Sequence, residues 1–466
     1  MRILIVGHGA REHALARRLK HDGHEVIACA ARENTGLQHD CHRVVPVTDY
    51  CSADIAALAR KLKIELLIAA DEVALFDGVA DSARKAGVPC IGHDREASFL
   101  LERDRHEIIA LLEPGGYARA PDGELVMSRR DWDALQPPER FVVKPIQAGS
   151  VFFSATPSHP RADLFPAWVE PYRPGIDFSL HYLVNTTGES FLGMTLDYPF
   201  LNQKSMTLTG GMGSVVPGTS DNVTVSDALL RDCKEMTTRL FRAIQTKRGM
   251  NLRGFVSAQF RKVGRQAIFT ELDCKPGNPE IVALLPTIAG DLGSVLLQAA
   301  KGKTPTVTLN GMASVAISMV PRSYPLRKIG QHIIPLSYLN NPAIHFGETR
   351  QDRSSIKSGR SRSLCVTGMG TTIMEACSKA MPLAIEIGQS TGLVYRPDIG
   401  HALDAPRAAE RVRKSLAFLK EKGGKRFMLR LSPEAHSSLK MLIESGRFKN
   451  ETEAINAAIN LAAGKH

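Results

Sequence analysis

Long apolar runs are missing from this sequence of 466 residues. No stretch approaches the roughly 20 consecutive apolar residues that a membrane-spanning helix needs. The opening segment MRILIVGHGAREHA has the pattern of a strand and a glycine-rich turn, not of a signal peptide. We therefore expect a soluble, cytoplasmic protein that does not contact a membrane.

Paired cysteines are missing as well. The eight cysteines form no CxxC pair and no zinc-like cluster, and they stand at Cys29, Cys41, Cys51, Cys90, Cys233, Cys274, Cys365 and Cys377. This spacing excludes a disulfide framework and predicts reduced, mostly buried thiols.

Acidic residues are fewer than basic ones, 48 against 59, which gives a formal net charge of +11. A basic balance favours anionic ligands such as nucleotides, sugar phosphates or nucleic acid, without choosing among them. The length is too great for one hydrophobic core, so three or four domains are expected.

Strands and helices alternate in the first hundred residues. Strands are predicted at 2–6, 24–29, 65–69 and 88–91, and helices at 11–21, 52–62 and 76–85. This alternation predicts a parallel α/β sheet. The turn at 7–10 offers backbone amides to a phosphate, although such a turn also serves tight packing alone.

The rest of the chain continues with less regular α/β patterns. Strands are expected at 141–144, 178–184, 191–195, 255–260, 267–272 and 364–367, and helices at about 225–245, 371–381 and 406–422. The basic, serine-rich segment 350–363 is predicted to be a solvated loop, with phosphate contact as the alternative.

Several motifs lie in one order along residues 1–402. They are GHGAREHALA at the start, Asn34 with Gly36, the segment 72–81, TGGMG at 209–213, ELDCKPGNPE at 271–280, LCVT at 364–367 and RPDIG at 396–400. Together they resemble the phosphoribosylamine–glycine ligase (glycinamide ribonucleotide synthetase) family of the ATP-grasp superfamily.

The resemblance implies an ADP-forming carboxylate–amine ligase of purine-type nucleotide biosynthesis or a parallel pathway. Such an enzyme first converts a carboxylate into an acyl phosphate, because an amine cannot displace oxide. The acid is glycine by default, and the amine is ribosyl-phosphate-like. Metal ions and cations must neutralise charge on the phosphoryl group that moves.

The same resemblance implies a nucleotide site and a metal site. ATP would be held by Lys144, Glu170 and Asp177, with Arg105 near the position of a second cation. Mg²⁺ or Mn²⁺ would bind Glu271 and Asp273, which alternate on a strand and so face one side. The alternatives are a surface lysine, loop carboxylates and a solvent-facing acidic edge.

Substrate and catalytic positions follow from the same motifs. The resemblance places the amine substrate at Gly9, Glu72, Asp81, Gly210, Gly211 and Gly213, and the catalytic positions at Lys275 and Asn278. Glycines allow backbone amides to approach a ligand closely. The alternative for 209–213 is a tight hairpin that binds nothing.

The predicted fold class is multidomain α/β and α+β. We expect a Rossmann-like domain at 1–100, an ATP-grasp domain at 101–305, a small α/β domain at 306–405, a helical linker at 406–424 and a strand-helix-helix module at 425–466.

The departures from the family pattern are concentrated in the active region. The loop 145–151 is short and lacks the family's lysine, and Lys275 and Asn278 stand where the family has Arg and Asp. Lysine lacks the planar fork with which arginine grips an anion. A different acid or amine therefore stays open, as does a weakened enzyme that serves as a nucleotide-sensing regulator.

The last 42 residues extend past the family's usual end and resemble a ribbon-helix-helix module. Alternating residues at 425–431 predict a strand, and two helices are expected at 433–445 and 450–463. Such modules dimerise through their strands and read DNA with the polar strand face. A homodimer is therefore expected, with DNA as a further candidate partner.

Overall fold

The computed structural model of the chain describes residues 1–135, 141–146, 152–154, 165–201, 208–325, 331–400, 433–445, 448 and 451–462. The chain divides into two compact units, Met1–Leu403 and Asp404–His466. Within the described ranges, no helix combines the length and apolarity needed to cross a membrane. In the second unit, α14 (Pro433–Glu444) and α15 (Glu451–Ala462) pack against each other.

The first unit begins with a parallel five-stranded sheet. Its strands lie in the order β3 (Arg43–Pro46), β2 (Glu25–Ala30), β1 (Arg2–Val6), β4 (Leu66–Ala69) and β5 (Cys90–Ile91). β1 and β4 are almost wholly apolar and buried, as parallel strands covered by helices require. The connecting helices are α1 (Ala10–His21), α2 (Thr35–Asp40), α3 (Ser52–Lys61), α4 (Glu72–Phe76) and α5 (Val79–Lys85). The predicted Rossmann-like N-terminal fold is confirmed.

A nine-stranded sheet forms the centre of this unit. Its order is β18 (Ile344–Phe346), β21 (Leu364–Gly370), β16 (Ala313–Met319), β13 (Leu208–Val216), β12 (Gly188–Phe200), β11 (Ile176–Asn185), β14 (Gly254–Val263), β15 (Gln266–Asp273) and β6 (Ala118–Arg119). The sheet runs without a break across the predicted domain boundary at 305–306. The predicted boundaries themselves stay predictions.

The two faces of this large sheet differ in chemistry. On β11, Tyr182 points to the apolar face, where its ring meets that of Phe241 on α9 (Asp227–Arg248) with centroids 5.4 Å apart. Ser179 and His181 lie on the opposite face and bond to polar side chains of neighbouring strands. Because side chains alternate along a strand, Glu271 and Asp273 of β15 share one face.

A smaller antiparallel sheet lies beside the large one. Its order is β7 (Glu124–Val126), β10 (Ala167–Pro171), β8 (Phe141–Pro145) and β9 (Phe152–Ser154). It has its own small core, in which Trp132 of α8 (Arg129–Ala134) packs on Phe141 with ring centroids 4.6 Å apart. The remaining elements are α6 (Arg95–Glu102), α7 (Arg105–Leu111), α10 (Glu280–Leu284), the 3-10 helix η2 (Leu285–Thr287), α11 (Leu292–Ala300), β17 (Ile333–Pro335), the 3-10 helix η3 (Leu336–Asn340), β19 (Thr349–Asp352), β20 (Ser355–Ser358) and α12 (Ile373–Thr391).

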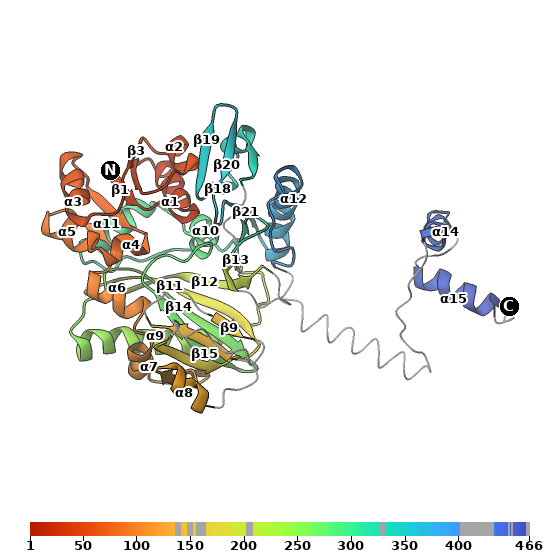
Figure 1. Ribbon diagram of the computed structural model, residues 1–466, viewed down its shortest axis with the longest axis horizontal. Helices are drawn as coiled ribbons and strands as arrows, with labels where there is room; N and C mark the ends of the chain where they lie inside the picture. The colour runs from red at the N-terminus through yellow and green to blue at the C-terminus, as the bar shows by residue number, and fades with distance from the viewer. Residues whose placement is uncertain are drawn as a thin grey trace. The chain divides into compact units, whose positions relative to one another are not determined.

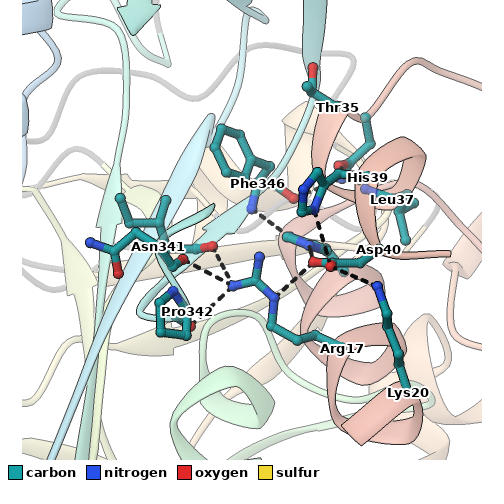
Figure 2. Close-up of polar contacts among 12 residues, drawn as sticks. Arg17, Lys20, Thr35, Leu37, His39, Asp40, Asn341, Pro342 and Phe346 are labelled. Atoms are coloured by element: carbon teal, nitrogen blue, oxygen red, sulfur yellow. Dashed lines mark hydrogen bonds and ion pairs between the residues drawn. The ribbon is translucent and has the colours of Figure 1, made fainter. Parts of the chain in front are cut away.

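Two sets of contacts join the N-terminal helices to the rest of the unit. Figure 1 shows α10 between α1 and strands β12 and β13, and α10 contacts all three. The second set surrounds Asp40 (Figure 2), which accepts hydrogen bonds from His13 Nε2 at 2.9 Å and Arg17 Nε at 2.8 Å. His13 Nδ1 in turn accepts from the Phe346 N–H at 2.8 Å, and Arg17 Nη1 donates to the carbonyls of Asn341, Pro342 and Ile344.

Three predicted elements are wrong in detail. The helix predicted at 76–85 is two helices, because Gly78 between them has a φ of +78°. The basic segment 350–363, predicted as a loop, contains the hairpin of β19 and β20. The helix predicted to end at 381 runs on through Pro382 to Thr391, since Ala384 and Ile387 beyond the proline are fully buried.

The glycine-rich segment 209–213, predicted as a turn, belongs to strand β13, which pairs with β12 and β16. Close packing explains its glycines. A Cβ on Gly211 would stand 2.4 Å from Pro279 Cδ, and one on Gly213 would stand 2.2 Å from Ile399 Cδ1.

Other predictions fall outside the described residues. These are most of the loop at 145–151, the helix at 406–422, the linker at 423–424 and the strand at 425–431. The two helices expected after that strand are present as α14 and α15.

Candidate active site

Lys144 connects the two sheets. It lies on β8 with 4% of its surface exposed, and its Nζ donates to the Thr270 carbonyl of β15 at 2.8 Å. The same Nζ is 2.9 Å from Glu170 Oε1 on β10. Glu170 also accepts from Trp168 Nε1 at 3.1 Å. Lys144 is therefore not a surface lysine, and Glu170 is not a loop carboxylate.

Asp177 lies at the start of β11, apart from this pair. Its Oδ1 accepts from Arg261 Nε at 2.6 Å, and the Arg261 guanidinium stands 5.0 Å from the ring centroid of Tyr172. Glu170 and Arg261 both line a crevice of about 20 Å³, together with Pro121, Asp122, Pro171, Arg173, Ile268 and Thr270. That volume holds about one water molecule, so a nucleotide needs this crevice to widen.

Glu271 is paired with a buried cation. Arg105 Nη2 donates to its Oε2 at 2.6 Å, and Arg105 is 7% exposed. Burial alone raises the pKa of a carboxyl group, but Arg105 and Lys144 together hold the pKa of Glu271 below its ordinary value. Glu271 is thus ionised and is not part of a solvent-facing acidic edge.

Asp273, two residues further along β15, has a pKa that is shifted in the opposite direction. Its Oδ2 accepts from Gln259 Nε2 at 2.6 Å. Burial raises the pKa of Asp273 to about 8, and the nearby carboxylate of Glu102 adds to the shift. Among the described residues, no group of three or more His, Cys, Asp or Glu side chains is arranged to hold a metal. Two carboxylates on one face still suit a hard cation that also binds substrate phosphates.

Lys275 lies among three acidic side chains of this region. Its Nζ lies 2.5 Å from Glu102 Oε1, 3.2 Å from Glu72 Oε2 and 3.8 Å from Asp273 Oδ1. Burial lowers the pKa of a lysine, but the Glu102 carboxylate outweighs burial, so the pKa of Lys275 lies well above its ordinary value. Lys275 is therefore a fixed positive charge and not a proton-transfer group at neutral pH.

Asn278 lies close to the first glycine turn and to strand β13. A Cβ on Gly9 would stand 3.9 Å from Asn278 Nδ2. Arg362 Nη1 donates to the carbonyl of Asn278 and, at 3.3 Å, to that of Gly211. The structure therefore brings Gly9, Gly211 and Asn278 together, although they come from three separate motifs.

Two predicted ligand contacts are already used inside the protein. The Gly9 N–H, expected to face a phosphate, donates to Glu12 Oε2 at 2.6 Å. Asp81 does not join the cluster, since its Oδ2 accepts from the Arg95 N–H at the start of α6. Of the predicted substrate residues, Glu72 lies nearest to the charged cluster, through its pairing with Lys275.

The sequence did not single out four charged residues of this region. Glu102 holds Lys275, Arg362 holds the segment around Asn278, and Asp197 and Glu280 are two further carboxyl groups, both partly buried. Burial raises the pKa of Asp197 to about 6 and that of Glu280 to about 7. Glu280 closes the motif at 271–280, which was the only signal available in the sequence.

Comparisons with known proteins show what the chain is similar to. Residues 1–101 match the family model "Phosphoribosylglycinamide synthetase, N domain". A phosphoribosylamine–glycine ligase of Mycobacterium tuberculosis is 29% identical over 433 residues, which cover 86% of this chain and 98% of the relative. The corresponding protein of Haemophilus influenzae is 26% identical over 88% of this chain and 99% of the relative.

Solved structures show the same fold. The phosphoribosylamine–glycine ligase of Thermotoga maritima superposes with a TM-score of 0.66 at 18% identity, covering 85% of this chain and 100% of that one. The biotin carboxylase domain of Hydrogenobacter thermophilus 2-oxoglutarate carboxylase, solved with MgADP, gives a TM-score of 0.60 at 9% identity, covering 86% of this chain and 94% of that one. By sequence and by fold, the chain is therefore similar to phosphoribosylamine–glycine ligases over most of its length, with an N-terminal domain of the phosphoribosylglycinamide synthetase type.

Proposed function

We propose that this protein is an ATP-dependent, ADP-forming ligase that joins a small carboxylic acid, glycine by default, to phosphoribosylamine or a similar amine. The observation that carries the proposal is the set of buried Lys144, Glu170 and Arg105 and partly buried Glu271 at the junction of the two sheets. This set supplies cations for phosphates beside an ionised carboxylate for a metal. The relatives named above, which align over most of the chain, are ligases of this kind.

Each residue of the set has a definite task in this proposal. Lys144 and Arg105 hold the phosphates of ATP, while Glu170 and Asp177 bind the adenosine end. Glu271 and Asp273 hold Mg²⁺ or Mn²⁺, which neutralises charge on the phosphoryl group in transfer. Asp273 must lose its proton to serve as a ligand, and an approaching dication favours that loss.

The acyl phosphate then needs an amine close by and water excluded. Gly9, Gly211 and Asn278 lie together on the side of the N-terminal domain, and we assign the amine substrate to this region, with Gly210, Gly213 and Glu72 on its border. Lys275 stays charged and orients Glu72 and Glu102. It is a point charge where the family's arginine would grip an anion with two parallel bonds, so the site suits a different acid as well as glycine.

The deciding experiment is an ADP-release assay on the purified full-length protein. A panel of amino acids is tested with Mg²⁺ and ATP, with and without phosphoribosylamine. ADP release that requires both one acid and the amine supports a ligase and names its acid. A protein that binds ATP but releases no ADP with any pair would contradict the enzyme and leave the nucleotide-sensing alternative, to which the comparisons lend no support. We place the reaction in the cytoplasm.

The second unit has a separate proposed role, the pairing of two copies of the chain. In α14 and α15, Leu439 and Ala454 are buried, whereas Met441 is 65% exposed. A pair of helices this small has little core of its own, and a second copy would cover the exposed apolar side chain.

Truncation after Gly424 tests the pairing by light scattering. The full chain should be a dimer and the truncated chain a monomer with the same nucleotide affinity. The alternation at 425–431 places Arg426 and Arg430 on the polar face of the predicted strand. DNA retention at low salt that disappears on replacing both by alanine would instead show a DNA-binding module. The same oligomer from both chains would exclude the pairing role.

A further inference from the structure

The hydrogen-bonding capacity of Arg105 is only partly used. Its Nη2 donates to Glu271, but its Nε and Nη1 are buried and have no hydrogen-bond partner among the described residues. A buried N–H without an acceptor is unfavourable, and more so when it belongs to a charged group. Three donors of one guanidinium therefore lack an acceptor in the described structure.

The surroundings of Arg105 favour an anion as that acceptor. Lys144 is a second buried cation, close enough to Glu271 to act on the same carboxylate. Lys144 already has two acceptors, the Glu170 carboxylate and the Thr270 carbonyl, whereas Arg105 has one. The guanidinium fork matches the oxygens of a phosphate, which can take two parallel N–H bonds.

The same contact competes with the proposed metal position. Arg105 Nη2 donates to Glu271 Oε2 at 2.6 Å and so takes up part of the carboxylate that a cation would bind. A bare dication at Glu271 would also stand beside two buried positive charges, Arg105 and Lys144, in a region of low dielectric. A site that repels a free metal ion accepts one only when phosphates add negative charge.

We infer that the contact of Arg105 with Glu271 acts as a latch. It hinders metal binding at Glu271 until the phosphates of the nucleotide draw Arg105 away. Without nucleotide, Arg105 occupies the carboxylate that a divalent cation needs. When triphosphate binds, the guanidinium turns its donors to the phosphates and Glu271 becomes free for the metal. Arg105 is then a positioning residue that makes metal binding conditional on nucleotide, an inference that rests on the proposed function.

Binding of Mn²⁺ alone tests the latch without any need for turnover. Free Mn²⁺ is measured by electron paramagnetic resonance during titration of the full-length protein, free of nucleotide. Arg105→Gln should bind Mn²⁺ about tenfold more tightly than wild type, because one repelling charge and one competing contact are gone. The double change Arg105→Gln with Glu271→Gln should remove this gain. Arg129→Gln, which removes a surface arginine from a pair with Asp133, should leave Mn²⁺ affinity unchanged.

A second titration measures the affinity for ATP, which should change in the opposite direction to the affinity for Mn²⁺. Metal-free ATP in EDTA, followed by calorimetry, should bind Arg105→Gln about tenfold more weakly than wild type. Arg105→Met fills the same space without charge and serves if the glutamine variant does not fold, as judged by circular dichroism. Tighter Mn²⁺ with weaker ATP supports the latch. Unchanged or weaker Mn²⁺ binding in a folded variant overturns it, while wild-type protein that binds no ATP at all overturns the proposed function instead.

Discussion

The cluster of charged side chains around Asp40 differs from the cluster around Glu271. In the Asp40 cluster every charged group is paired, and its two unpartnered atoms, Thr35 Oγ1 and His345 Nδ1, belong to neutral side chains. In the Glu271 cluster the atoms without a partner among the described residues include Nε and Nη1 of the charged Arg105.

This difference separates a structural cluster from a ligand site. A buried charge with all its partners fixes the packing of the elements that carry it, here α1 and α2 against β18. A buried charge with spare donors is stabilised further only when a ligand arrives. We therefore expect substitutions in the first cluster to change stability and substitutions in the second to change binding and rate.

The largest effect is expected from Asp40→Ala. The change leaves the largely buried Arg17 without its carboxylate, and breaking a buried pair from one side costs about 3–5 kcal/mol. Urea unfolding measures this loss. Asp54→Ala, at an exposed position of α3, is the control and should change stability by less than about 1 kcal/mol. Equal losses in both variants would show that the Asp40 cluster does not lock the N-terminal helices.

Glu271→Gln tests the other cluster. The amide oxygen still accepts from Arg105, so the fold should be retained, but a charged metal ligand is lost. ADP formation should fall by about 100-fold or more, as for loss of one electrostatic contact to the transition state. The matched control is Glu235→Gln on the exposed face of α9. Wild-type ADP release from Glu271→Gln would make the metal assignment wrong.

Lys144→Ala is expected to weaken ATP binding by about tenfold or more, since a hydrogen bond to a charged group contributes about 1.5–3 kcal/mol. Calorimetry on the variant and on the wild-type protein measures the change in the dissociation constant. Lys247→Ala, which removes an exposed pair with Glu113, is the control and should bind ATP as the wild type does. An unchanged dissociation constant for Lys144→Ala would mean that the nucleotide is held elsewhere.

The smallest expected effect is the change in folding stability per pH unit that comes from His13. Burial lowers the pKa of His13 to about 4, against about 6.5 in the unfolded chain. The unfolded state therefore binds more protons between these values, and His13 contributes stability that is complete above pH 6.5 and is lost as pH falls towards 4. The slope from this one group is at most about 1.4 kcal/mol per pH unit.

Urea unfolding at several pH values measures that slope. His13→Gln, which cannot take up a proton, should show a shallower dependence on pH than wild type. Identical slopes for the two proteins would show that His13 is not the group that senses acid.

The family and the fold class could be predicted from the sequence because they depend on local pattern. Apolar strands such as β1 and β4 alternate with helices at regular intervals, and the motifs at 7–14 and 271–280 keep their spacing. Helix boundaries are predicted less well where a single residue, such as a glycine or a proline, can either end a helix or lie within one. Gly78 breaks a helix that the apolar pattern continues, and Pro382 lies inside a helix that its own chemistry opposes.

The sequence alone determined which residue types are present for the chemistry, namely Lys144, Glu271, Asp273 and Lys275 in their motifs. Only the tertiary structure decided what each of them faces. Arg105 and Glu271 are 166 positions apart, and Lys275 is 173 positions from Glu102. Contacts over such separations depend on how helices α6 and α7 pack against β15, and burial in that packing sets the charge state of each group. No local pattern carries that information, because a pKa and a pairing are properties of the surroundings rather than of the residue.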